Sequence, residues 1–565
     1  MNSGNKSKIS TERRNLLLAT GAAALSSLMP TLAFGQQSHS KLATSTKGMV
    51  TSPHELATKA GLDVLKSGGN AIEAAITIAA CLSVTYPHFS GFGGDAFMII
   101  SDPSGKVETI SGIGQAPEKL PEYSGSIPVR GPQSMLTTAG NIDTLGKAYE
   151  LSRSSFDGKK TWEALLTPAI TFAKEGFPVT ESERFWLDFR KAELQSMPGI
   201  SAGFLIDGKI PETGQIFHQP KLAFTLEMLA ERGPRDFYEG KLAEIIAKGL
   251  REAGSPLTAQ DLALTQAQIE PPLKVSYRGG TLLAHQPPTQ GITTLEIMGI
   301  LDRFDLAKIP EGSADYYHVL VEAVKQAFID RRFVADPKFV DVPTAKMLSP
   351  THLEANAKKI QMGKALAWPH VFKKGDTVFI GATDSKGNSV SMLSTVYFDW
   401  GSGVLVGDTG ILWHNRGASF SLDPASPNRL QPGKRPFHTL NPGMYLKDGK
   451  PTILYGTQGA DGQPQTLAAV LTRLIDYRMD PLTALARPRF LLGKTFSDSR
   501  DSLKLEKDAG ETVFAELAKR GHEISPIAAQ SPLAGHPGAI VIDRLTGRIT
   551  GAHDPRSDGY AMGLE

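Results

Sequence analysis

The chain has 565 residues, of which 41% are hydrophobic and 21% charged, so it can bury a large core. Lysine plus arginine (60) and aspartate plus glutamate (58) nearly balance, and the formal charge of +2 argues against a nucleic-acid partner or an anionic membrane surface. The single cysteine, Cys81, excludes an intramolecular disulfide, and the apolar run around it predicts a core position.

The N-terminus has the pattern of an export signal. The paired arginines Arg13 and Arg14 precede an apolar run that ends near Leu28, and small residues follow around Ala33. The run is too short to span a bilayer. An arginine pair before such a segment is typical of the twin-arginine route, so residues 1–35 are interpreted as a cleaved signal peptide. We therefore expect a periplasmic protein with no stable membrane anchor; an uncleaved anchor is the alternative.

Two helices are predicted at the start of the mature chain. Apolar spacing indicates one over 54–65 and a second, nearly all-apolar helix over 70–84, which Asn70 and Glu73 cap reciprocally. The glycine loop 90–94 then enters a strand. Phosphate loops precede helices and carry Lys-Ser/Thr, so we expect these glycines to allow close backbone packing instead.

Further helices are predicted over 162–174 and 241–253, from 293 onward, and over 314–332. Residues 338–376 contain several prolines and lysines with weak periodicity, and they are interpreted as a mobile connector. This connector leads into Thr377.

A β-hairpin is predicted directly after the connector. Two apolar, β-branched runs flank a Ser-Lys-Gly turn, where Gly387 suits the left-handed position. Pairing Asp384 with Asn388 places Thr377 opposite Thr395 on one face of the hairpin. By themselves these could be ordinary surface threonines.

Short strands and turns are predicted after the hairpin. The expected strands cover 403–407, 410–414, 443–446, 451–455 and 538–542, and the expected helices cover 465–477 and 509–520. The coarse interpretation is a helix-rich module followed by a module of sheet plus helices.

The usual catalytic and cofactor motifs do not occur in the sequence. It has no Gly-x-Ser-x-Gly elbow, His-Glu-x-x-His helix, phosphate loop or Cys-x-x-Cys pair. The 13 histidines do not cluster at ligand spacings, so we predict no metal and no cofactor. Covalent or acid–base catalysis by side chains remains.

Eight short motifs follow one another along most of the chain. They are Gly68-Gly69-Asn70-Ala71, Ser90-Gly91-Phe92-Gly93-Gly94, Pro287-Pro288, a long helix ending before Asp336-Pro337, the hairpin from Thr377, Gly401-Ser402-Gly403-Val404, Gly433-Lys434-Arg435-Pro436 and Asp554-Pro555-Arg556. In this order they resemble the γ-glutamyltransferase family of N-terminal-nucleophile hydrolases. The resemblance, from about residue 48 onward, implies an α/β fold built as a four-layer αββα sandwich.

The resemblance also implies a precursor that cuts itself between Asp376 and Thr377. Residues 36–376 would form a large subunit and residues 377–565 a small one. Thr377 would be the nucleophile, and its free α-amine, with a pKa near 8, would act as its base. Thr395 would orient it, and the backbone N–H groups of Gly459 and Ala460 would form the oxyanion hole.

The substrate pocket departs from the family's pattern for a γ-glutamyl group. Ile113 stands at the arginine position that should hold the α-carboxylate, and the other replacements are Tyr397 for an asparagine, Arg416 for an amide, Ser419 for an aspartate, and His438 and Thr439 for two serines. Gln115, close to Ile113, completes the predicted substrate-binding set. A buried zwitterion without its charge partners would lose several kcal/mol of binding energy.

These replacements predict a pocket for an acyl group with a carboxylate and no α-amine, which Arg416 would bind. An ion pair between Arg416 and a neighbouring acidic residue is equally open. We predict a self-processing hydrolase, possibly also an acyltransferase, that acts on a small-molecule amide. The alternatives are a genuine glutathione hydrolase and an unprocessed periplasmic binding or scaffold protein. The sequence leaves open the acyl group, the leaving amine and any assembly beyond the two subunits.

Overall fold

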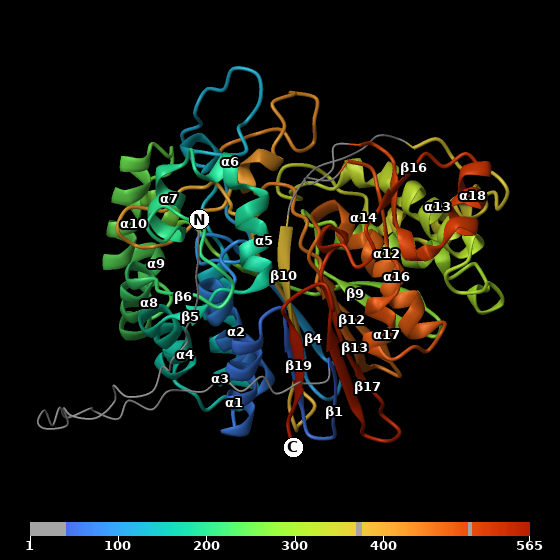
Figure 1. Cartoon of the computed structure of the whole chain (residues 1–565), viewed down its shortest axis with the longest axis horizontal. Coiled ribbons are helices and arrows are strands. Elements are labelled where there is room, and N and C mark those ends of the chain that lie inside the picture. The colour runs from blue at the N-terminus through green and yellow to red at the C-terminus, as the bar shows by residue number, and fades with distance from the viewer. Residues whose placement is uncertain (1–40, 369–375, 495–499) are drawn as a thin grey trace, which may run out of the picture. The chain divides into compact units, whose positions relative to one another are not determined.

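Two seven-stranded antiparallel sheets form the centre of the computed structural model, which describes residues 41–368, 376–494 and 500–565 (Figure 1). One sheet comprises β19 (Tyr560–Gly563), β2 (Met49–Ser52), β10 (Asp376–Thr383), β11 (Ser389–Tyr397), β3 (Asp95–Ser101), β4 (Val107–Gly112) and β7 (Gln268–Glu270), in that order. The other comprises β1 (Leu42–Ser45), β18 (Ile549–His553), β17 (Pro537–Ile542), β13 (Lys450–Thr457), β12 (Gly443–Lys447), β9 (Gly280–Ala284) and β8 (Leu273–Tyr277). The predicted signal peptide lies outside the described residues.

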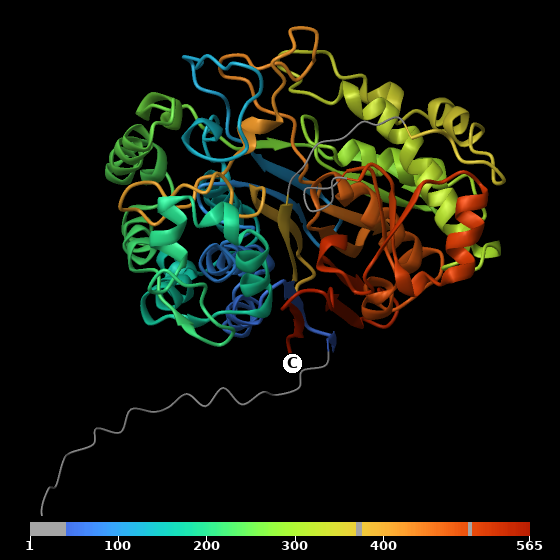
Figure 2. The same cartoon turned by 45° about the horizontal axis from the view of Figure 1, so that its top comes forward.

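Helices cover the outer face of each sheet (Figure 2). The β10 sheet carries the helices of the first half of the chain: α1 (Glu55–Lys66), α2 (Ala71–Thr85), α3 (Asn141–Ser155), α4 (Trp162–Glu175), α5 (Glu181–Phe189), α6 (Lys191–Leu194), α7 (Pro198–Phe204), α8 (Pro220–Arg232), α9 (Asp236–Glu239), α10 (Lys241–Ala253) and α11 (Ala259–Ala263). The β13 sheet carries α12 (Gly291–Leu301), α13 (Ala314–Asp330), α14 (Thr344–Met347), α15 (Pro350–Ala357), α16 (Gln463–Ile475), α17 (Pro481–Ala486) and α18 (Glu511–Lys519). Two small sheets, β14 (Phe490–Leu492) with β15 (Leu503–Glu506) and β16 (Ile524–Ile527), and β5 (Phe177–Pro178) with β6 (Ile216–Phe217), lie outside this core.

This arrangement confirms the predicted four-layer αββα sandwich. The prediction of two successive modules was wrong, because residues 40–565 form one unit and each large sheet takes strands from both halves of the chain. The sheets face each other through β10 and β11 on one side and β13 and β17 on the other. The new N-terminus at residue 377 would therefore begin in the middle of the sandwich.

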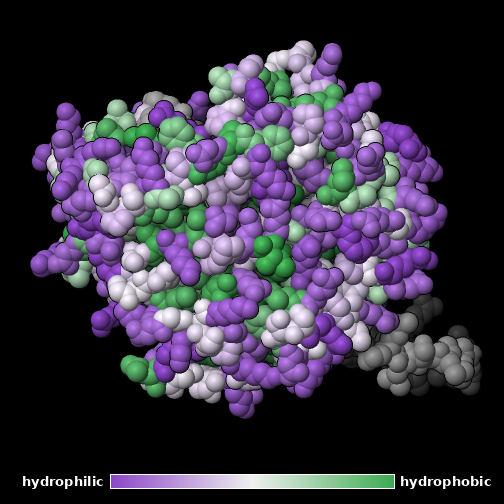
Figure 3. Space-filling view, turned by 180° about the vertical axis from the view of Figure 1, so that it is seen from behind, coloured by the Kyte–Doolittle hydropathy of each residue, from purple (hydrophilic) through white to green (hydrophobic). Residues whose placement is uncertain are grey.

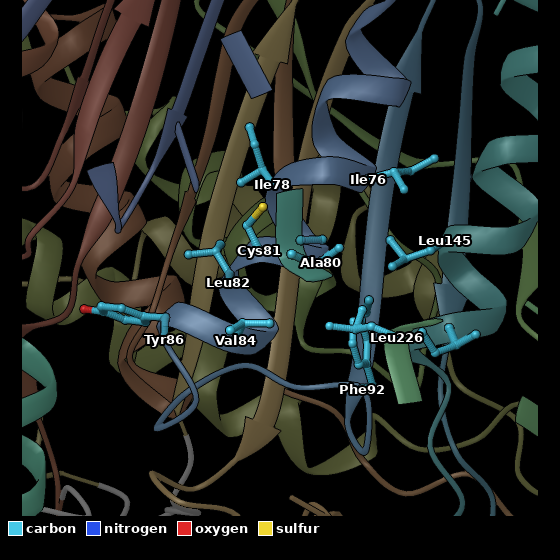
Figure 4. Packing of buried hydrophobic residues seen from close by; sticks show 14 of the residues in the cluster. Ile76, Ile78, Ala80, Cys81, Leu82, Val84, Tyr86, Phe92, Leu145 and Leu226 are labelled. Atoms are coloured by element: carbon cyan, nitrogen blue, oxygen red, sulfur yellow. The ribbon is translucent and has the colours of Figure 1, made fainter. Parts of the chain in front are cut away.

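The core around α2 matches the sequence analysis closely. Every residue of α2 is buried, and Asn70 and Glu73 form the predicted capping box. Cys81 lies in the apolar cluster between α2 and its neighbours, and burial raises the pKa of its thiol (Figure 4). A helix that is apolar on all sides can pack only in an interior position, which α2 occupies between sheet and outer helices.

Two local predictions were wrong. Residues 403–407 and 410–414 form loops, because Gly403, Gly407 and Gly410 take φ values of +73°, +52° and +69°, which interrupt an extended chain. The expected connector 338–376 contains the helices α14 and α15. Leu353 and Ala357 of α15 are buried against the cluster around α12, and this tertiary contact supplies what the weak local periodicity lacked.

Figure 3 shows a face on which hydrophilic residues predominate and apolar residues are scattered between them. Within the described residues, each helix is too short or too polar to cross a bilayer.

Candidate functional site

The predicted hairpin forms, with the predicted register over most of its length. Pairing runs from Thr383–Ser389 to Val378–Ser394 and then shifts by one residue, so that Asp376 pairs with Tyr397. Thr377 and Thr395 therefore lie at this irregularity, immediately beyond the last regular pair. A β-bulge of this kind redirects side chains and is common beside active sites.

The ring of Phe379, on β10 of the hairpin, packs against the facing sheet. A Cβ placed on Gly456 would come within 2.4 Å of this ring, and one on Gly538 within 2.5 Å. The facing strands β13 and β17 therefore need glycine at these positions for the ring to fit. Thr377, two residues before Phe379, therefore lies near the ends of these strands.

Thr377 is fully buried, and its side chain is held by a residue that the sequence analysis missed. Its Oγ1 accepts a hydrogen bond of 3.0 Å from Nε2 of Gln463, the first residue of α16. The Oε1 of Gln463 in turn accepts the N–H of Asn441 at 3.3 Å. Gln463 could have been found from the sequence, because a helix begins directly after the Gly459 turn and the first residues of that helix have to face it.

Thr395 is also fully buried, and its Oγ1 accepts the N–H of Tyr397 at 2.8 Å. The glycine loop packs directly against it: a Cβ on Gly94 would lie 2.0 Å from the Thr395 carbonyl oxygen. The predicted role of these glycines in close backbone packing is thus confirmed.

The turn after β13 presents two neighbouring backbone donors. Gly459 has a φ of +125° and Ala460 a φ of +48°, so both residues lie at positive φ, which a residue with a Cβ such as Ala460 rarely adopts. The Gly459 carbonyl accepts the N–H of Gly462. Within the described part of the chain, the N–H groups of Gly459 and Ala460 have no acceptor. Two adjacent free donors are what an oxyanion hole requires.

Three buried side chains hold this turn in place. Nε2 of Gln290 donates to the carbonyl oxygens of Ala460 (2.6 Å) and Thr439 (2.9 Å). Arg331 donates to Oε1 of Gln290 at 3.0 Å and pairs with Asp461 at 3.0 Å. Gln290 and Arg331 were not predicted, because they come from segments far from the turn in the sequence.

Arg416 lies on the other side of the site, fully buried on the face of Tyr397. Its guanidinium carbon is 3.7 Å from the centre of the Tyr397 ring, and Nη1 donates a long hydrogen bond of 3.4 Å to Oγ1 of Thr439. Its Nε and Nη2 have no partner among the described residues. Burial lowers the pKa of Arg416 to about 10, which leaves it charged at neutral pH.

A buried carboxylate orients His438. Oδ2 of Asp95 lies 3.0 Å from Nε2 of His438, and Nδ1 of His438 accepts the N–H of Leu440. This pattern makes His438 a neutral imidazole that donates to Asp95. Burial alone would raise the pKa of Asp95, but His414, His438 and Arg416 together hold it at about 2.

The other predicted pocket residues are held by neighbouring groups. Oγ of Ser419 lies 2.9 Å from the Arg416 carbonyl and 3.0 Å from that of Phe437. Gln115 bonds to the Asp261 carbonyl and to the Thr138 hydroxyl. The structure therefore brings Tyr397, Arg416 and Thr439 into contact, whereas the side chain of Gln115 is engaged elsewhere.

A family model described as gamma-glutamyltranspeptidase matches residues 57–564. The chain belongs to the γ-glutamyltranspeptidase family. The oxamate amidohydrolase proenzyme of Klebsiella pneumoniae subsp. pneumoniae is 42% identical over 525 residues, covering 92% of this chain and 99% of that protein. The glutathione hydrolase proenzyme of Escherichia coli (strain K12) is 30% identical over 535 residues, covering 90% of each. The crystal structure of cephalosporin acylase from Bacillus halodurans matches with a TM-score of 0.84 at 31% identity, over 95% of this chain and 100% of that one.

Membership of this family makes the chain an N-terminal-nucleophile enzyme. It is an amide hydrolase or acyltransferase, formed as a precursor that is cleaved into two subunits, and it acts on small molecules.

Proposed function

We propose that this enzyme hydrolyses small amides whose acyl group carries a free carboxylate, through an acyl ester on Thr377. The observation that carries the proposal is the unfilled donor capacity of Arg416. Its Nε and Nη2 are buried without an acceptor in the described chain, and a guanidinium in that state loses the hydrogen bonds it would make in water. A substrate carboxylate would accept from both nitrogens at once.

Nothing comparable favours an α-amino group in the same place. Two buried carboxylates act on Arg416, and both are engaged: Asp461 pairs with Arg331, and Asp95 accepts from His438 and from the backbone N–H groups of Gly114 and Gly140. Ile113 packs in an apolar cluster with Phe97 and Phe379. The similarity to an oxamate amidohydrolase supports the same choice, since oxamate is a carboxylate-bearing amide.

The chemistry would follow from the geometry at Thr377. Gln463 donates into a lone pair of Oγ1, so the hydroxyl proton remains available for the α-amine that cleavage frees. As Oγ1 attacks the amide carbon, that proton moves to the amine, and the carbonyl oxygen becomes negative between the N–H groups of Gly459 and Ala460. The amine then protonates the departing nitrogen, the C–N bond breaks, and an acyl ester remains.

Water completes the cycle. It attacks the ester carbon while its proton passes to the α-amine, the acid leaves, and Oγ1 of Thr377 regains a proton. Transfer to an acceptor amine would use the same ester, but hydrolysis needs only water, so we favour hydrolysis.

The test is a substrate panel assayed with the processed enzyme. Oxamate, succinamate and glutaramate should release ammonia, with kcat/KM at least about tenfold above that of matched amides that lack the carboxylate, a difference of about 1.4 kcal/mol. Equal rates on the uncharged amides would contradict the role of Arg416. Faster release from γ-glutamyl anilides than from every amide in the panel would instead indicate a genuine glutathione hydrolase.

The processing site and the location of the enzyme are parts of the same proposal. Sequencing the small subunit from its N-terminus should read Thr377-Val378-Phe379, which would place the boundary between the two subunits at 376/377. Fractionation of cells should find the protein in the periplasm, with Arg13→Lys plus Arg14→Lys retained in the cytoplasm. A small subunit that begins elsewhere would contradict the assignment of Thr377.

A further inference from the structure

Three side chains from three helices converge on the outer side of the β13 sheet. Glu296 comes from α12, Asp330 from the last position of α13 and His352 from α15. Nε2 of His352 lies 2.6 Å from Oδ2 of Asp330 and 3.4 Å from Oε1 of Glu296. One ligand atom from each of the three residues lies within 4.8 Å of the other two.

The contacts around His352 exceed what one ring nitrogen can satisfy. Besides the two carboxylates, the side-chain amide of Asn356 lies 3.1 Å from the same Nε2. A ring nitrogen carries either one proton or one lone pair, so it serves one such partner well and not three. In addition, Glu296 is fully buried; its Oε1 accepts the side-chain amide of Asn356 at 3.3 Å, and its Oε2 receives no nitrogen or hydroxyl donor within the described part of the chain.

Two buried carboxylates this close need a shared proton or a cation to offset their charges. Lys359, just after the end of α15, is bound to Oδ1 of Asn356 instead of to either carboxylate. A divalent ion would neutralise both carboxylates and accept the lone pair of a neutral imidazole.

We propose that Glu296, Asp330 and His352 bind a divalent transition-metal ion, of the Zn²⁺ or Mn²⁺ class. Adjacent ligands around such an ion lie about 3 Å apart, because each bond is about 2.0–2.2 Å long, and the observed separations bracket this value. The mixed carboxylate and imidazole set suits these ions better than Ca²⁺, which prefers oxygen alone. The side chains of Asp330 and His352 are 17% and 21% exposed, which gives the ion a path from solvent.

The ion would join helices that support the oxyanion turn. Asp330 directly precedes Arg331, which binds Gln290 and Asp461, and Glu296 lies on the helix that begins just after Gln290. Binding would therefore stabilise α12, α13 and α15 as a unit behind the site. The ion takes no part in the chemistry at Thr377, so the site does not depend on the proposed substrate.

A second cluster, His318, Glu322 and His522, serves as an internal control. His318 binds His522 at 2.8 Å through Nδ1 and the Gln361 carbonyl through Nε2, and Lys325 pairs with Glu322. Its ring nitrogens are thus used within the protein, and a lysine already neutralises its carboxylate.

The test is isothermal titration calorimetry of Zn²⁺ and Mn²⁺ into the processed two-chain protein, after dialysis against a chelator. We expect one ion per chain, a higher Tm with the ion bound, and weak binding of Ca²⁺. Glu296→Gln and His352→Gln should each weaken the binding of Zn²⁺ at least about tenfold, whereas His522→Gln and the exposed Glu354→Gln should not.

The wild-type protein alone can refute the proposal, even if a variant fails to fold. Co²⁺ should produce visible absorption bands of an imidazole and carboxylate site in the wild type, and Zn²⁺ should displace them. Absence of stoichiometric binding by any of these ions would overturn the proposal. So would binding that survives Glu296→Gln but is lost in His522→Gln.

Discussion

Two buried arginines flank the site, and they differ in how their donors are used. Arg331 pairs with Asp461, donates to Gln290 and contacts the rings of Phe328 and Phe437. Arg416 rests on one ring and makes a single long hydrogen bond, while two of its nitrogens have no acceptor among the described residues. The two are buried to nearly the same extent but paired unequally, so we interpret the first arginine as structural and propose that the second binds a ligand.

Removal of the predicted nucleophile has the largest expected effect, and this variant is the reference for the tests of both arginines. Thr377→Ala should remain a single chain and show only background amide hydrolysis, because neither self-cleavage nor acyl-ester formation has another hydroxyl in place. Denaturing electrophoresis and an ammonia assay measure both. Thr377→Ser, which keeps a hydroxyl, is the control and should still be cleaved. A cleaved Thr377→Ala protein would refute the assignment.

Arg331→Met should cost about 3–5 kcal/mol of folding stability, because it removes the partner of a buried carboxylate. Thermal unfolding of the unprocessed Thr377→Ala background isolates this effect from cleavage. Arg416→Met in the same background should change the stability far less, since Arg416 has no ion-pair partner to abandon. Equal losses in the two variants would show that both arginines are structural.

Replacing the Ala460 residue by lactic acid, which changes its backbone N–H to an ester oxygen and keeps the Cβ, should lower kcat by about 10²–10³, because it removes one of the two proposed oxyanion donors. Ala460→Gly keeps the N–H and suits a φ of +48°, so it should retain most of the activity. Single-turnover kinetics with the processed enzymes make the comparison. Similar losses in both variants would mean that backbone shape, and not the N–H, matters here.

Arg416→Met should lower kcat/KM for carboxylate-bearing amides by about 2 kcal/mol, roughly 30-fold, since hydrogen bonds to a charged group are worth about 1.5–3 kcal/mol. Self-cleavage should continue at the wild-type rate, because that reaction binds no free carboxylate substrate. The two rates separate recognition from chemistry. A parallel fall in both would contradict a role in recognition.

The smallest expected effect is a loss of folding stability at acidic pH. Burial, reinforced by Arg416, lowers the pKa of His438 from 6.5 to about 3, although Asp95 opposes this shift. Between these values the unfolded chain binds a proton that the folded chain excludes, so stability is fully present above pH 6.5 and falls as the pH falls toward 3. Burial lowers the pKa of His285 to about 3 in the same sense. Thermal unfolding across this window should show the decline, and a flat profile would contradict neutral buried histidines.

Local features of the fold were predictable because they depend on neighbours in the sequence. The capping box at Asn70 and Glu73 and most of the hairpin register follow from hydrogen bonds and turns within a few residues. The prediction of strands near Gly403 and Gly410 was wrong for a related reason: the apolar pattern is visible in the sequence, but the positive φ of those glycines is not.

The sequence by itself was enough to predict Thr377, Thr395 and the Gly459 turn as the catalytic positions, because motif order and hairpin pairing are properties of the chain. Only the tertiary structure decided which side chains support them and which stay open. Gln463, Gln290 and the acidic pair with His352 make contacts between segments that are distant in the sequence and meet only in the folded protein. Whether a buried arginine is paired or waits for a substrate depends on that packing, since the free energy of a buried charge is set by the groups around it and not by its neighbours in sequence.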